Sequence, residues 1–169
     1  MRRDGGRCAA AGRLLSSNAR VCLVDGNVRS SRLSTMLSVD ERTRLVRRGA
    51  APSELCLQVG PNLYLARLCD IPAGEVELPP VNEMRRFFAG LEEKFDHVLI
   101  DAPEASSTGD ALVLSTLANG SVLVVEANRT RKMKAHAAKE KLDAAGVRLL
   151  GTVLDNRTFP IPESLYRLF

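Results

Sequence analysis

The stretch VCLVDGNVR (Val21 to Arg29) decides the fold class, and HVLIDAP (His97 to Pro103) repeats its pattern. In each, a short apolar and β-branched run ends in an aspartate. Buried parallel strands have this composition, and open α/β folds bind their ligands at the carboxyl ends of such strands. Two carboxylates at one sheet edge suggest a Mg²⁺ and nucleotide site, because Mg²⁺ takes oxygen ligands and neutralises phosphate charge. For Asp25 taken alone, the alternative is that it caps its own turn.

Strand-like and helix-like segments alternate along the rest of the chain, which is the α/β pattern. Further strands are expected at 62–68, 122–125 and 149–154, and helices at 30–37, 107–117 and 130–145. The clearest helix follows Asn82, a candidate N-cap, and it is identified by apolar residues at i, i+3, i+4 and i+7: Met84, Phe87, Phe88 and Leu91. Thr130 is the candidate cap of the last helix. The stretch 38–60 has mixed charge and little periodicity, so we expect a loop there with a short helix at 52–57.

Composition points to one ordinary globular domain spanning residues 1–169, with 45% hydrophobic and 26% charged residues. The 4 cysteines show no C-x-x-C spacing, which argues against a zinc site or a disulfide framework and fits a reducing cytoplasm. No apolar run approaches the roughly 18 residues of a membrane span. The net charge of +4 includes a lysine-rich segment near 132–141, which we interpret as a solvated helix face rather than a nucleic-acid surface.

Four segments in order resemble the bacterial tyrosine kinases (BY-kinases) of capsule and exopolysaccharide biosynthesis. VCLVDGNVRSSRLSTML resembles their Walker A′ segment, an apolar strand followed by D-x-D-x-R, and FDHVLIDAP resembles their Walker B segment. GDALVLSTLANGSVLVVEANRTRK and LLGTVLDNRTFPIPESLYRLF resemble the two segments that follow in that family. The resemblance runs from about Val21 to the C-terminus. It implies an α/β fold of the deviant-Walker P-loop type shared with ParA/MinD-type ATPases, with three layers and helices on both faces of a mostly parallel sheet.

The same resemblance implies roles for three residues. Asp25 matches the first A′ aspartate, near Mg²⁺ and the transferred phosphoryl group. Asp101 matches the Walker B aspartate that holds the hydrated metal, and Arg29 matches the A′ arginine. The cofactors implied are ATP and Mg²⁺. The partner implied is a membrane polysaccharide co-polymerase, which would hold a cytoplasmic chain, or an oligomer of it, at the inner face of the membrane.

Two departures from the family lie at these segments. Asn27 stands where the family has its second A′ aspartate, which removes a negative charge from the site. Asp155 stands where a strand-end asparagine contacts the adenine, and a carboxylate cannot supply the amide donor. The neighbouring Asn156 is the candidate substitute.

The largest departure concerns the phosphate loop. A P-loop needs a strand, then glycines whose N–H groups hold phosphates, then Lys-[Ser/Thr]. The chain offers Gly5-Gly6-Arg7-Cys8 with no apolar strand before it. Arg7 is bulkier than lysine, and the sulfur of Cys8 is a poor ligand for Mg²⁺. We therefore expect a degenerate or truncated N-terminus without the P-loop strand.

Three hypotheses follow for function. The first is a BY-kinase-like component of polysaccharide assembly whose ATP binding and tyrosine-kinase activity are impaired or lost. The second is an active ATP-dependent tyrosine kinase with a truncated gene model. The third is a ParA-like ATPase or DNA-binding module. The only tyrosines, Tyr64 and Tyr166, do not form the C-terminal cluster that the family phosphorylates, and this favours the first.

Overall fold

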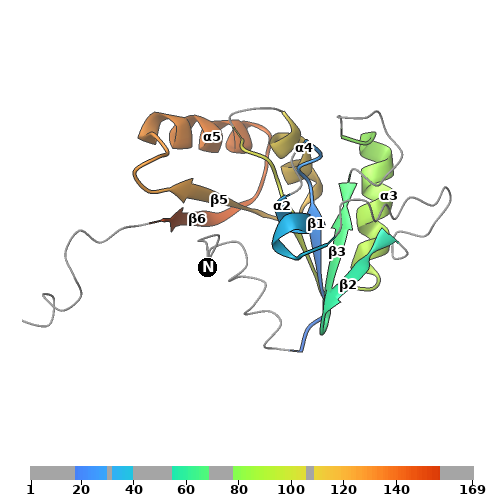
Figure 1. Ribbon diagram of the computed structural model, residues 1–169. Coiled ribbons are helices and arrows are strands. Elements are labelled where there is room, and N and C mark those ends of the chain that lie inside the picture. Colours follow the sequence, from blue (N-terminus) through green and yellow to red (C-terminus); the bar gives the residue numbers. More distant parts are fainter. Residues whose placement is uncertain (1–17, 30–31, 40–54, 69–77, 106–108, 157–169) are drawn as a thin grey trace, which may run out of the picture. The chain divides into compact units, whose positions relative to one another are not determined.

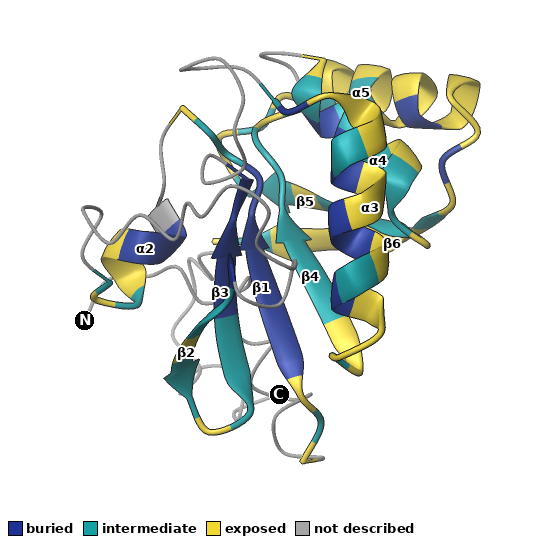
Figure 2. Cartoon of the chain, turned by 90° about the vertical axis from the view of Figure 1, so that its right-hand side faces the viewer, coloured by how far each residue is buried: buried dark blue, intermediate teal, exposed yellow. Residues whose placement is uncertain are grey.

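A four-stranded sheet contains both aspartate-ending strands. In the computed structural model its strand order is β2-β3-β1-β4, and its members are β1 (Val21–Asp25), β2 (Leu57–Gly60), β3 (Leu63–Arg67) and β4 (His97–Asp101). β1 pairs in parallel with both β3 and β4. The carboxyl ends of three strands therefore meet at one edge. Figure 1 shows β1 and β3 side by side, and Figure 2 shows β4 next to β1. The structure describes residues 18–29, 32–39, 55–68, 78–105 and 109–156.

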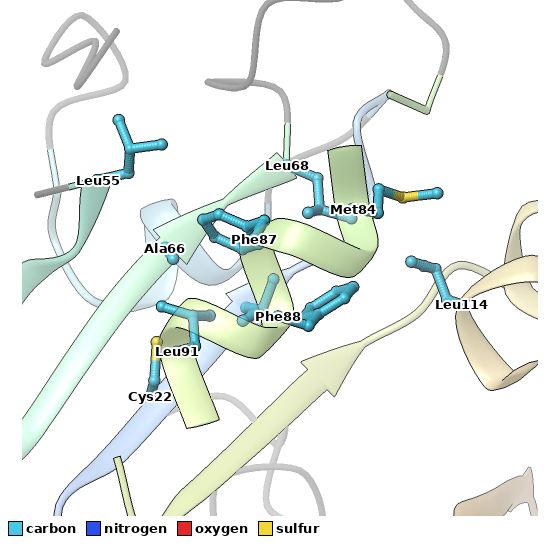
Figure 3. Close-up of a cluster of buried hydrophobic side chains, with 10 residues drawn as sticks. Cys22, Leu55, Ala66, Leu68, Met84, Phe87, Phe88, Leu91 and Leu114 are labelled. Carbon is cyan, nitrogen blue, oxygen red and sulfur yellow. The ribbon is translucent and has the colours of Figure 1, made fainter. Parts of the chain in front are cut away.

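Helices cover both faces of this sheet. On one face, α3 (Val81–Glu92) packs its apolar side on alternate residues of the strands, and α4 (Asp110–Leu117) adds Leu114 (Figure 3). On the other face, Leu33 of α2 (Arg32–Met36) packs with Val21 and Leu23. The expected three-layer α/β arrangement with a mostly parallel sheet is confirmed.

Burial explains why β1 forms the centre of the sheet. All five of its residues are buried, and Figure 2 shows β1 dark blue along its length. Because side chains alternate along a strand, Cys22 and Val24 face α3 whereas Val21 and Leu23 face α2. Burying a valine or leucine contributes about 1.5–3 kcal/mol, so a run that is apolar on both faces is stable only between two helical layers.

The described residues from Ala118 onward form a second unit. It consists of β5 (Ser121–Glu126), α5 (Lys132–Ala144) and β6 (Leu149–Asp155), with β5 and β6 paired in parallel. α5 buries Leu142, and the chain leaves the helix at Gly146, whose φ of +68° suits glycine. Its lysines are exposed, as expected for a solvated face. That the chain is one domain stays a prediction.

One expected loop is partly a strand. The prediction of a loop over 38–60 is wrong at its end, where β2 pairs antiparallel with β3. A two-residue turn, Pro61-Asn62, joins the two strands, and Asn62 has a φ of +56°. Asparagine tolerates the left-handed region and proline favours the turn position before it. Most of the remaining stretch, residues 40–54, lies outside the described residues.

Both side-chain caps expected within the described residues are also wrong. Pro80 is the N-cap of α3, so Asn82 lies inside the helix. Arg131 is the N-cap of α5, and the Thr130 hydroxyl instead accepts a hydrogen bond from the Glu126 backbone N–H at 3.1 Å. Neither helix has a side-chain cap.

The outer edge of β4 bears on whether a P-loop strand is present. β4 is the last strand of its sheet, and within the ranges given above no strand pairs with its outer edge. Residues 1–17, which include Gly5, Gly6, Arg7 and Cys8, lie outside the described residues. The expectation for the phosphate loop therefore stays a prediction.

Candidate functional site

Asp25 and Asp101 lie side by side at the carboxyl edge of the sheet. They are register partners at the ends of β1 and β4, and neighbouring strands are about 4.8 Å apart. The Asp25 side chain is buried, with 2% of its surface exposed, and Asp101 is half-buried. The expected meeting of the two carboxylates at one edge is confirmed.

The turn after β1 fixes the Asp25 carboxylate. The backbone N–H of Asn27 donates to Asp25 Oδ1 at 3.0 Å, and the backbone N–H of Gly26 donates to the carbonyl oxygen of Asp101 at 3.0 Å. Asp25 therefore does cap its own turn, as the alternative interpretation held. A carboxylate has about four acceptor positions, and this bond occupies one of them.

Gly26 allows the close approach of β1, β4 and α4 next to the site. A Cβ built on Gly26 would lie 2.7 Å from Leu114 Cδ1 and 3.0 Å from the Asp101 carbonyl oxygen. The first contact is far too short for two carbon atoms, and the second involves rigid backbone. Only glycine fits between Asp25 and Asn27 without moving the aspartates.

Arg67 is a charged residue of this edge that the sequence analysis missed. It ends β3 and is the register partner of Asp25, with 5% of its surface exposed. The sequence signal was present, because NLYLAR (62–67) is a third apolar run that ends in a charged residue. The row across the three strand ends is therefore Arg67, Asp25, Asp101.

All three side chains of the row belong to the face that α2 covers. They follow Leu65, Leu23 and Leu99 at a spacing of two, and those leucines pack on the α2 side. Within the part of the chain that the structure describes, the buried polar or charged residues are Asp25, Arg67 and Ser34 of α2. A buried charge is costly unless it is compensated, which makes this edge electrostatically unlike the rest of the core.

No protein-family model matches the chain. Several known proteins nevertheless resemble it in sequence. The tyrosine-protein kinase YwqD of Bacillus subtilis is 28% identical over 142 residues, covering 82% of this chain and 60% of YwqD. The tyrosine-protein kinase ptk of Acinetobacter johnsonii is 24% identical over 147 residues, covering 85% of this chain and 20% of ptk. The chain is a relative of the bacterial tyrosine kinases. The chain spans 20% of the length of ptk and 60% of the length of YwqD.

Solved structures of bacterial tyrosine kinases share the fold. The kinase domain of Escherichia coli tyrosine kinase ETK matches with a TM-score of 0.70 at 18% identity, over 90% of this chain and 62% of that domain. The septum site-determining protein MinD of Pyrococcus horikoshii, complexed with Mg-ADP, matches with a TM-score of 0.64 at 20% identity, over 92% of this chain and 67% of MinD. The expected likeness to both BY-kinase and MinD/ParA-type P-loop folds is confirmed.

The other candidate residues are Arg29, Asp155 and Asn156, and the last two belong to the second unit. Arg29, which the resemblance matches to the A′ arginine, is exposed four residues beyond Asp25. Asp155 ends β6 as the register partner of Glu126, in the second unit. The Asn156 side-chain amide donates to Glu126 Oε1 at 2.9 Å. The amide expected to replace the adenine-binding asparagine of the bacterial tyrosine kinases is thus engaged within the protein.

Cys22 and Cys56 interact through their side chains. Cys22 lies on β1, and Cys56 lies just before β2. Their side-chain hydrogen bond, together with burial, raises the pKa of the Cys22 thiol well above its ordinary range. The same hydrogen bond lowers the pKa of Cys56, and the Lys94 ammonium lowers it further while burial opposes the change. Cys22 faces α3, so this pair is not on the face of the carboxylates.

Proposed function

We propose that the chain is a BY-kinase-like component of capsule or exopolysaccharide assembly, in which Asp25 and Asp101 bind Mg²⁺ with nucleotide phosphate and in which ATP binding and tyrosine phosphorylation are impaired. The observation that carries this proposal is the register pairing of the two aspartates at the carboxyl edge of a parallel sheet. The ligand side of an open α/β sheet is that edge.

The two carboxylates fit Mg²⁺. This ion is commonly bound through one or two protein carboxylates together with phosphate and water oxygens. Asp25 and Asp101 come from adjacent strands, and Asp25 is held in place by the Asn27 N–H. When bound, Mg²⁺ would neutralise phosphate charge. The likeness to MinD complexed with Mg-ADP supports this assignment.

Two residues support the proposed impairment of nucleotide binding. Asn27 offers a neutral amide where the resemblance expects a second carboxylate, so the site has less negative charge to hold a cation. Asn156 donates its amide to Glu126 rather than offering it to a base. Each change removes a group that the resemblance assigns to nucleotide binding.

The partner we propose is a membrane polysaccharide co-polymerase, which would hold the chain, alone or as a homo-oligomer, at the inner face of the membrane. Support comes from sequence relatives named CpsD and CapB and from the fold likeness to the chimerical protein CapA2B2, with a TM-score of 0.72 at 21% identity. No helix in the described part of the chain is long and apolar enough to cross a membrane.

A side-by-side assay with YwqD tests the proposed loss of activity. Both proteins are incubated with Mg²⁺ and radiolabelled ATP, and phosphotyrosine is measured on each chain and on a tyrosine-containing peptide polymer. We expect at least about a hundredfold less transfer by this chain, since losing charge stabilisation of a phosphoryl group costs factors of about 10³ or more. Transfer at the rate of YwqD, abolished by Asp101→Asn, would show an active kinase and refute the impairment.

Association with the partner is tested separately. The chain is mixed with detergent-solubilised membranes in which the co-polymerase encoded by its own genome carries an affinity tag. We expect co-purification that survives in the Asp101→Asn variant, because the contact does not need catalysis. If the chain stays in the unbound fraction with every such co-polymerase, the proposed role in polysaccharide assembly is wrong.

A further inference from the structure

Arg67 places a positive charge beside the pair of aspartates. It is the register partner of Asp25 on β3, and Asp101 is the register partner of Asp25 on β4. Asp25 is therefore the middle member of the row. Arg67 and Asp25 are both buried, so solvent screens their interaction less than it would on the surface.

The net charge of Arg67, Asp25 and Asp101 predicts which charged ligands this edge of the sheet can bind. Two carboxylates directly opposite one another repel, and a cation beside them offsets that repulsion. The three side chains carry a formal charge of −1, so a bare divalent cation would leave the edge at +1. Without Arg67 the same cation would give neutrality. The excess positive charge is removed when the cation brings an anionic group with it.

We propose that Arg67 makes this edge selective for a divalent cation that carries a phosphate group and disfavours the bare cation. The proposal rests on the proposed function for the class of ligand, and it adds a specificity-determining residue. Arg67 acts here through charge, as a positioning residue for the metal–phosphate pair. Its guanidinium also has the planar donor geometry that suits phosphate oxygens.

Substitutions at Arg67 separate charge from packing. Arg67→Met removes the charge and keeps a long side chain, whereas Arg67→Lys keeps the charge and serves as the matched control. The probes are Mn²⁺ alone, measured by the loss of its free electron-paramagnetic-resonance signal, and preformed manganese–pyrophosphate, measured by calorimetry. Circular dichroism establishes that each variant is folded.

We expect Arg67→Met to bind Mn²⁺ alone about tenfold more tightly than the parent, because one repulsive unit charge a few ångströms away is gone. It should also bind manganese–pyrophosphate less tightly than the parent. Arg67→Lys should stay within about threefold of the parent for both probes, because the charge is retained. A purely structural arginine would produce no gain in Mn²⁺ affinity. Equal or weaker Mn²⁺ binding by folded Arg67→Met would overturn the proposal.

The parent protein supplies a second test in case Arg67→Met does not fold. It should bind manganese–pyrophosphate at least about tenfold more tightly than Mn²⁺ alone, and a ratio near one would overturn the inference. Asp25→Asn separates this inference from the proposed cation site. If Asp25→Asn binds both probes as the parent does, the cation site itself is wrong. If it loses both while the parent ratio is near one, only the role of Arg67 is wrong.

Discussion

Gly26 shows at the scale of one residue how tightly the carboxylate edge is built. Its N–H donates to the Asp101 carbonyl, and a Cβ there would meet Leu114 at 2.7 Å. We expect Gly26→Ala to lower the free energy of unfolding by about 1–3 kcal/mol, the usual cost of overpacking. Urea titration followed by circular dichroism measures this, since the chain has no tryptophan.

The matched control is Gly109→Ala. Nothing lies within 4 Å of a Cβ at Gly109, so its free energy of unfolding should change by no more than about 0.5 kcal/mol. Equal stability of the parent and Gly26→Ala would mean that β1, β4 and α4 do not approach each other as described.

Cys56 gives a prediction that depends on pH. The hydrogen bond from Cys22 lowers the pKa of Cys56, Lys94 adds to the effect, and burial opposes it. The thiolate therefore forms at lower pH in the folded chain than in the unfolded one, where cysteine has a pKa of about 8.5. The pH profile of Cys56 alkylation by iodoacetamide, read by peptide mass spectrometry, should have its midpoint below that of the chain in urea.

Cys22→Ala is the control variant for that profile. It removes the hydrogen-bond donor, so the midpoint for Cys56 should move up to or above the value in urea, because burial then outweighs Lys94. A folded parent whose midpoint equals or exceeds the value in urea would contradict the assigned hydrogen bond.

The two aspartates could be predicted from sequence, and the arginine could have been. Each aspartate closes an apolar run, and parallel pairing brings such run ends together whatever the loops do. Arg67 closes a run in the same way, but a terminal arginine is usually a solvent-exposed strand end. Its burial depends on its position beside Asp25, which only the pairing of β1 with β3 reveals.

At the scale of elements, α3 carries much of the packing on one face of the sheet. Leu91 is fully buried among Cys22, Phe88 and their neighbours. We expect Leu91→Ala to lower the free energy of unfolding by about 2–5 kcal/mol through lost burial and a residual cavity. Chemical unfolding measures it, and the adjacent exposed position, Glu92→Ala, should stay within about 0.5 kcal/mol of the parent.

If Glu92→Ala destabilised the chain more than Leu91→Ala, the described packing of α3 on the sheet would be wrong. A small loss at Leu91 together with a large one at Glu92 would mean that the helix presents its other side to the sheet.

The elements differ in how far the sequence predicts them. α3 was predicted because its apolar residues repeat at the helical period over about two turns. β2 was missed because its four residues, Leu57–Gly60, are too few for a period to be distinguished, and it is held by pairing with β3. Asn82 and Thr130 have the right chemistry for caps, but the chain enters both helices at other residues. Element boundaries depend on tertiary contacts that short motifs do not record.

At the scale of the whole molecule, the two units should differ in local stability. β1 has a hydrogen-bonded strand on each side and all its residues are buried. β6 pairs with β5 alone in the described structure, and five of its seven residues are exposed. Amide hydrogen exchange reports the free energy of local opening, so the amides of β1 should exchange at least about tenfold more slowly than those of β6.

Exchange followed by mass spectrometry over minutes to hours gives this comparison. Protection of β6 equal to that of β1 would mean that the second unit is stabilised by contacts beyond those described for it.

We propose that Asp25 and Asp101 together form a cation site for nucleotide phosphate. Calorimetric titration of Mg²⁺–ATP into the chain tests it most directly, with Asp101→Ala and excess EDTA as controls and YwqD as the reference. We expect binding that is weaker than that of YwqD, that disappears with EDTA, and that is lost in folded Asp101→Ala. No heat from the parent, or equal binding by the parent and Asp101→Ala, would contradict it.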